Sequence, residues 1–174
     1  MKIEEIRTII QRAKEAGTEH LDLSNKEIDI LPDEIGQLTH LKSLDLSYNQ
    51  ISTLPDSIAN LENLEELFLM RNCLIELPSN IDKLKHLKSL DISYNPIHKL
   101  PKQIGSLSDL QTFDASFCLL QAIPTEMINL SKMARVHFDE NPIDFPPIKV
   151  IRRGWYAIKY FLSEREKNRN IQFS

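Results

Sequence analysis

Hydrophobic residues recur along this chain at a fixed interval of 23 residues, in six successive copies. One apolar column contains Leu21, Leu44, Leu67, Leu90, Phe113 and Val136, and another, two residues later, contains Leu23, Leu46, Leu69, Ile92, Ala115 and Phe138. Two apolar positions separated by one other residue place both side chains on the same face of a strand. We therefore expect each copy to contribute one short strand.

A proline column marks where the chain turns back in each copy. It contains Pro32, Pro55, Pro78, Pro101, Pro124 and Pro147. Proline keeps the preceding residue extended and suits the first position of a helix. In the second copy Ile58, Leu61 and Leu64 follow at intervals of three, which predicts a single helical or 3₁₀ turn after the proline.

One such unit cannot bury its own apolar side chains, whereas stacked units bury them in a continuous core. The pattern predicts one continuous domain: a capping helix at 1–17, six repeats at 18–147, and a capping helix with a basic tail at 148–174. The first cap has an apolar face of Ile3, Ile6, Ile9, Ile10 and Ala13. The second helix is expected to start at Pro146-Pro147, with an apolar stripe of Val150, Ile151, Trp155, Ile158, Phe161 and Leu162.

The repeat resembles the leucine-rich-repeat family in its short, 23-residue cytoplasmic form. The second copy reads Leu41-x-x-Leu44-x-Leu46-x-x-Asn49-x-Ile51-x-x-Leu54-Pro55-x-x-Ile58-x-x-Leu61. The resemblance implies an α/β fold: a curved, right-handed solenoid with a parallel sheet on its concave face and short helices or 3₁₀ turns on its convex face. It also implies that Asn49, Asn72, Asn95 and Asn141 bind the loop backbone, a pattern from which Lys26 and Cys118 depart.

The C-terminal end, including Pro146-Pro147 and Gly154, resembles the end of the repeat region in Roco-type GTPases and related stand-alone repeat proteins. From Lys149 onward the chain has seven Lys or Arg against two Glu, although the whole chain has a net charge of −4. This segment is interpreted first as a solvated helix face with a frayed tail. The alternative is a docking site for an acidic partner or a membrane surface.

Composition narrows the classes of function. The net negative charge disfavours nucleic acid as the main partner, and no apolar run is long enough to span a membrane. The acidic start lacks the apolar region of a secretory signal. Two cysteines cannot form a disulfide framework, which favours a reducing, cytoplasmic location. Four scattered glycines provide no phosphate-binding loop, and no cofactor is expected.

Catalytic and metal sites find little support in the sequence. His20, Asp22 and Ser24 share one strand face, but neighbours on such a face lie roughly 7 Å apart, too far for a catalytic triad. Asp91, Asp114 and His137 should lie on adjacent strands, yet they form no dense ligand cluster. Cys118 occupies the buried asparagine column and is expected to be a poor nucleophile.

Strand residues that alternate with the core leucines should face the concave groove. The expected rows contain Asp45, Asp91 and Asp114 and, two residues later, Ser47, Ser93 and Ser116. The third copy is unusual there, because Phe68, Met70 and Arg71 replace the Asp, Ser and Tyr of its neighbours. Aromatic residues, Met and Arg are enriched at the cores of protein interfaces. We therefore predict a central hot spot of Tyr48, Phe68, Met70, Arg71, Tyr94 and Phe117. Asp45, Asp91 and Asp114 form an acidic surround that favours a basic partner; the alternative is that Phe68 only packs against its neighbours.

The predicted function is that of a non-catalytic, cytoplasmic protein–protein interaction scaffold or adaptor, acting as a monomer. Resemblance to small signalling adaptors extends this to partners among small GTPases. The first alternative is the recognition arm of a larger enzyme, either a Roco GTPase or a ubiquitin ligase effector. The second alternative is a bacterial effector delivered into host cells.

Overall fold

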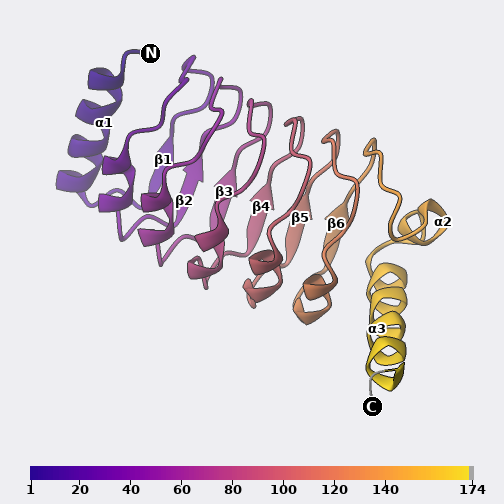
Figure 1. Ribbon diagram of the computed structural model, residues 1–174. Coiled ribbons are helices and arrows are strands. Elements are labelled where there is room, and N and C mark those ends of the chain that lie inside the picture. The colour runs from indigo at the N-terminus through magenta and orange to yellow at the C-terminus, as the bar shows by residue number, and fades with distance from the viewer. Residues whose placement is uncertain (173–174) are drawn as a thin grey trace.

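The computed structural model, which describes residues 1–172, is a solenoid with a six-stranded parallel sheet in the order β1 to β6 (Figure 1). The strands are β1 (His20–Asp22), β2 (Ser43–Asp45), β3 (Glu66–Phe68), β4 (Ser89–Asp91), β5 (Thr112–Asp114) and β6 (Arg135–His137). Each strand pairs with the next at a shift of 23 residues, so that Leu44 lies beside Leu67 and Leu67 beside Leu90. The repeat-based prediction of the fold is therefore confirmed.

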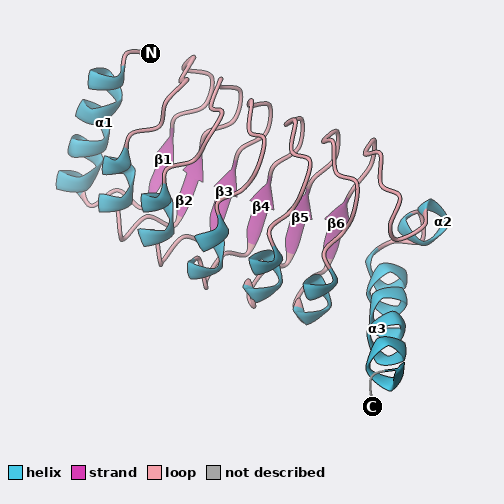
Figure 2. Ribbon diagram, viewed as in Figure 1, coloured by secondary structure: helices cyan, strands magenta, loops and turns pink. Residues whose placement is uncertain are grey.

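Each proline column residue is followed by a five-residue 3₁₀ turn in the first five copies. The turns are η1 (Asp33–Gln37), η2 (Asp56–Asn60), η3 (Ser79–Lys83), η4 (Lys102–Ser106) and η5 (Thr125–Asn129), and they line the side of the solenoid away from the sheet (Figure 2). The prolines have extended backbone and immediately precede the turns. They cap the turns, and do not occupy the first helical position.

The column of asparagines forms a buried hydrogen-bond ladder between copies. Asn95 accepts the N–H of Leu74 at 3.0 Å and donates to the carbonyl oxygens of Leu69 and Ile92, both at 2.9 Å. Asn49, Asn72 and Asn141 make equivalent bonds. The role implied by the family resemblance is thus confirmed in this chain: each amide closes its own turn and binds the preceding copy.

Cys118 interrupts this ladder. Its thiol is 3.4 Å from the carbonyl oxygen of Ile92, but it cannot replace the amide oxygen that would accept the N–H of Ile97. That N–H instead donates to the backbone oxygen of Asn95 at 2.8 Å. We expect Cys118→Asn to raise the free energy of unfolding by about 1 kcal/mol, because it restores a buried hydrogen bond. Urea unfolding monitored by circular dichroism measures this, and Cys118→Ala, which adds no amide, should give no increase.

The N-terminal end of the core is covered by α1 (Ile3–Ala16), which buries Ile6, Ile10 and Ala13. Ile3 and Ile9, also predicted on its apolar face, are partly buried. Gly17 follows with φ of 62°, a left-handed conformation that glycine adopts without steric cost. The helix therefore ends where the sequence indicated.

The C-terminal cap differs from the single helix expected from the sequence. It consists of α2 (Ile148–Ile151) and α3 (Trp155–Gln172), separated at Gly154, whose φ of 81° is incompatible with a continuous helix. Trp155, Ile158 and Leu162 are buried against the last copy. Arg169, part of the predicted basic tail, lies outside the residues whose side chains are described. Within residues 1–172, no helix is long and apolar enough to span a membrane.

Candidate protein-binding surface

The strands present a central row of side chains on the face opposite the core leucines. The row contains Asp22, Asp45, Phe68, Asp91, Asp114 and His137, in register across the sheet. Phe68 lies directly between Asp45 and Asp91 and is half-buried. The third copy therefore places one large apolar side chain in a row that is otherwise polar.

The aspartates of this row also close the turns at the strand ends. A carboxylate oxygen of Asp45 accepts the backbone N–H of Ser47 at 2.8 Å, and Asp114 accepts that of Ser116 at 2.8 Å. Asp91 accepts both the N–H of Ser93, at 2.9 Å, and its hydroxyl, at 2.6 Å. The predicted acidic surround thus has a structural role, and its carboxylates are only partly exposed.

The serines that follow these aspartates are not part of the groove surface. The sequence placed Ser47, Ser93 and Ser116 on the next concave row, but all three are buried. The chain begins to turn immediately after Asp45, Asp91 and Asp114, because the strands contain only three residues. The period-two alternation therefore ends before these positions, and this part of the prediction is wrong.

Four of the predicted hot-spot residues form a continuous stack beyond the strand ends, which we call the aromatic–arginine ladder: Tyr48, Arg71, Tyr94 and Phe117. The rings of Tyr94 and Phe117 are parallel, with centroids 4.3 Å apart. The Arg71 guanidinium carbon lies 4.5 Å from the Tyr94 ring centroid and 5.6 Å from that of Tyr48. These distances are within the range of cation–π attraction and ring stacking.

Backbone geometry explains why these side chains meet. All four residues have φ between 54° and 57°, a left-handed conformation that is unusual for bulky residues. Tyr48, Arg71 and Tyr94 precede asparagines of the column, and Phe117 precedes Cys118 at the equivalent position. Each N–H donates to the next copy, as Tyr48 does to Met70 at 2.8 Å. The same turn directs the asparagine inward and its predecessor outward. The rings consequently remain 50%, 39% and 46% exposed for Tyr48, Tyr94 and Phe117.

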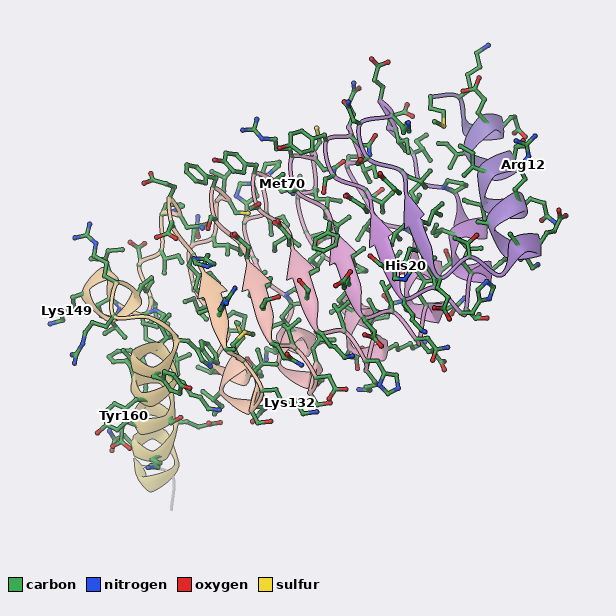
Figure 3. The ribbon with its side chains drawn as sticks, turned by 180° about the vertical axis from the view of Figure 1, so that it is seen from behind. Arg12, His20, Met70, Lys132, Lys149 and Tyr160 are labelled. Atoms are coloured by element: carbon green, nitrogen blue, oxygen red, sulfur yellow. The ribbon has the colours of Figure 1, made fainter. Side chains whose placement is uncertain are left out.

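The predicted hot spot therefore has two parts. The ladder lies at the end toward which the strands run, and Met70, labelled in Figure 3, lies at the same end. Met70 is half-buried on the third copy, as is Phe68 on β3. The two parts are connected through the third copy, since Phe68, Met70 and Arg71 lie within four consecutive residues. A partner contacting both parts would cover the central four copies.

A second concave row, which was not predicted from the sequence, lies at the start of the strands. It contains His20, Ser43, Glu66, Ser89, Thr112 and Arg135. Just before this row Lys42 pairs with Glu19 at 2.9 Å and Lys88 with Glu65 at 2.6 Å. The hydrogen bond from Lys42 lowers the pKa of Glu19. The row lies two residues before the central row, so the same alternation of inward and outward side chains, continued toward the N-terminus, predicts it.

Catalytic and metal-binding geometry is not assembled on this surface. Asp22 accepts the N–H of Ser24 at 2.8 Å and closes a turn, as its equivalents do. Asp91, Asp114 and His137 lie on adjacent strands as expected, but the described residues contain no cluster of His, Cys, Asp and Glu able to hold a metal ion. Burial raises the pKa of the Cys118 thiol to about 11, which makes it a poor nucleophile.

The fold and this surface define a class of protein, the repeat solenoid with an open recognition face. The model of the leucine-rich repeat region family matches residues 19–85 and 74–151, and the chain belongs to the leucine-rich-repeat family. Proteins of this family and fold are typically non-catalytic binding scaffolds, and this chain is a protein-interaction module of that kind. The resemblance of the C-terminal end to Roco-type proteins stays a prediction.

Several solved structures are similar to this chain. A Leptospira interrogans LRR protein is 38% identical with a TM-score of 0.74, over 77% of this chain and 34% of that one. The LRR ectodomain of the receptor kinase SOBIR1 from Arabidopsis thaliana is 26% identical with a TM-score of 0.63, over 71% and 70%. The LRR ectodomain of the plant membrane receptor kinase GASSHO1/SCHENGEN3 from Arabidopsis thaliana was solved in complex with CASPARIAN STRIP INTEGRITY FACTOR 2. It is 30% identical with a TM-score of 0.66, over 74% of this chain and 16% of that one.

The chain spans about a third of the length of the Leptospira protein. A search of curated proteins gives no match.

Proposed function

We propose that this chain is a scaffold or adaptor that binds a protein partner through the aromatic–arginine ladder together with Phe68 and Met70. The observation that carries the proposal is the ladder itself, in which Arg71 lies between two exposed tyrosines. Tyr and Arg are the residues most enriched among energetic hot spots. A stacked ladder also holds its side chains in place, so that little rotamer entropy remains to be lost on binding.

The aspartates of the central row favour a partner with basic residues. Asp45 and Asp91 flank Phe68, and Asp114 lies beside Asp91. Each uses one carboxylate oxygen for its turn and remains partly exposed. A partner with a basic residue next to an apolar or aromatic anchor would match this arrangement, because opposite charges at an interface increase association rate and specificity. The GASSHO1/SCHENGEN3 structure, a complex with CASPARIAN STRIP INTEGRITY FACTOR 2, supports the use of this fold to bind another protein.

We extend the proposal to small-GTPase-linked signalling in the cytoplasm, with the chain acting as a monomer. This extension depends on the family resemblance of the repeat. The alternative, a recognition arm within a longer protein, is favoured by the Leptospira relative, of which the similar region is only 34%. Roco GTPases and ubiquitin ligase effectors are the classes of enzyme in which such an arm would act. A bacterial effector delivered to host cells is the second alternative.

Affinity capture with the wild-type chain and with a Phe68→Ala/Arg71→Ala double variant tests the binding surface. The double variant should lose the specific partner, with affinity reduced at least about tenfold, because it removes an apolar anchor and the centre of the ladder. A matched control, Ile75→Ala/Lys99→Ala, removes one apolar and one basic exposed side chain away from the ladder.

The readout is quantitative mass spectrometry of the captured proteins, followed by titration of the purified partner. Both variants should give wild-type circular dichroism, since the four residues are half-buried or exposed. A double variant that folds normally and keeps full affinity would show that the ladder is not the binding site.

A further inference from the structure

We propose that the free edge of β6 binds an extended, acidic segment of a partner protein, which joins the sheet as a seventh parallel strand. The surface lies at the C-terminal end of the sheet, one copy beyond Phe117 of the aromatic–arginine ladder, and the proposal does not depend on the function proposed above. Strand addition to an open sheet edge is a general mode of peptide recognition: backbone hydrogen bonds provide affinity, and alternate side chains provide specificity.

In the earlier copies, backbone N–H groups at and just after the strand end donate hydrogen bonds to carbonyl oxygens of the next copy. Ala115 donates its N–H to His137 at 2.9 Å, and Phe117 donates to Asp139 at 2.8 Å. Phe138 and Glu140 are the equivalent residues of the last copy, but β6 ends the sheet, so no strand follows within the described residues to accept their N–H groups. Among the described residues neither N–H donates to a backbone oxygen, so both are available to pair with a further strand. An added strand would supply the acceptors.

A cleft of about 420 Å³ lies beside this edge, between β6 and the C-terminal cap. We call it the terminal cleft. One wall consists of residues 136–141, and the other includes Ile143, Ile148, Ile151 and Arg152. Figure 1 shows α2 at the level of the strand ends, with α3 below it along the last copy. Its volume falls within the usual range for ligand-binding clefts.

The core is incompletely covered at this cleft. Val136 is partly exposed, whereas its equivalents in the four preceding copies, from Leu44 to Phe113, are buried. Ile148 of α2 is 52% exposed. An extended segment with aliphatic residues at alternate positions would cover both side chains.

Charge favours an acidic segment. Arg135 is exposed on β6, Arg152 lines the terminal cleft, and Lys149, labelled in Figure 3, lies on α2 beside it. Among the side chains described, at residues 1–168, no carboxylate forms an ion pair with any of these three. Arg152 lines the terminal cleft together with Asp139 and Glu140, whereas Arg135 lies at the start of β6. The carboxylates of the incoming strand therefore belong at its start, opposite Arg135.

A capped synthetic peptide with the sequence of residues 89–95, carrying Ser89→Glu, is a suitable probe. In the chain this segment pairs in parallel with its neighbours. By the same register its glutamate would lie opposite Arg135 and its aspartate opposite His137. Saturating peptide should slow amide hydrogen exchange at Phe138 and Glu140 roughly tenfold or more, measured by NMR, because it supplies hydrogen-bond acceptors.

Two variants of the chain test the α2 wall of the terminal cleft. One modified peptide tests the backbone pairing with β6. Ile148→Glu, which places a carboxylate against the acidic peptide, should weaken binding at least about tenfold. Ile75→Glu alters an isoleucine of similar exposure, 53%, in another copy and should have no effect. The peptide N-methylated along its backbone cannot donate to β6 and should also bind at least about tenfold more weakly.

Three results would overturn the proposal. The first is unchanged exchange at Phe138 and Glu140 under millimolar peptide. The second is equal binding of the N-methylated peptide, which would exclude backbone pairing. The third is protection of these amides without peptide in a dimeric chain, since the edge would then be occupied by a second copy; light scattering detects that dimer.

Discussion

Replacing Asn95 by alanine is expected to lower the free energy of unfolding by about 3 to 4 kcal/mol, since one buried side chain holds two copies together. Its amide oxygen accepts the N–H of Leu74, and its amide group donates to Leu69, Ile92 and Ser93. Alanine would leave these backbone groups in a core that water does not reach. Urea unfolding followed by circular dichroism measures the loss.

The control for this experiment is Asn63→Ala. Asn63 also bonds to a preceding copy, donating to the carbonyl oxygen of Thr39 at 2.8 Å, but it is exposed. Water can replace that bond, so the expected loss is about 0.5 to 1 kcal/mol. Similar losses for the two variants would mean that the asparagine column is not what connects the copies.

The second large effect is expected at Gly105, where the structure has no room for a side chain. A Cβ at this position would lie 2.2 Å from the backbone oxygen of Glu126, in the next 3₁₀ turn. Because η4 and η5 would have to move apart, Gly105→Ala should lower the free energy of unfolding by about 3 kcal/mol. Thermal unfolding by calorimetry would measure the decrease.

Gly17→Ala is the matched glycine control. Gly17 has a left-handed backbone, but nothing lies within 4 Å of the point that a Cβ would occupy. Alanine there should cost only about 1 kcal/mol, the penalty of the left-handed conformation alone. If Gly105→Ala were no more destabilising than Gly17→Ala, the 3₁₀ turns of η4 and η5 would not be in close contact.

The column containing Gly105 illustrates the limit of sequence reasoning. It includes Gly36 but also Ala59, Asp82 and Ile128, so the repeat pattern alone gives no reason for a glycine. The requirement arises from the distance between two particular turns, which depends on how every side chain in both copies packs. The predicted exposure of Ser47, Ser93 and Ser116 failed for a similar reason, because a three-residue strand ends before the alternation reaches Ser47.

The candidate site was predicted in part. Departures from the repeat at Phe68, Met70 and Arg71 single out the third copy, because a regular background makes an unusual residue visible; binding through this copy stays a proposal. The stacking of Arg71 on Tyr94 was not predictable, since it requires several residues to adopt positive φ. Hydrophobic periodicity carries no information about that choice of backbone conformation.

The 23-residue period is sufficient to specify the fold: it sets the strand register, the turn positions and the leucine core, because only stacking buries the apolar columns. Which exposed residues meet became visible only in three dimensions. The aromatic–arginine ladder, the break at Gly154 and the open edge of β6 depend on local backbone angles and on where the last copy ends. The contacts of the ladder join residues from different copies, and a one-dimensional pattern does not specify their distances.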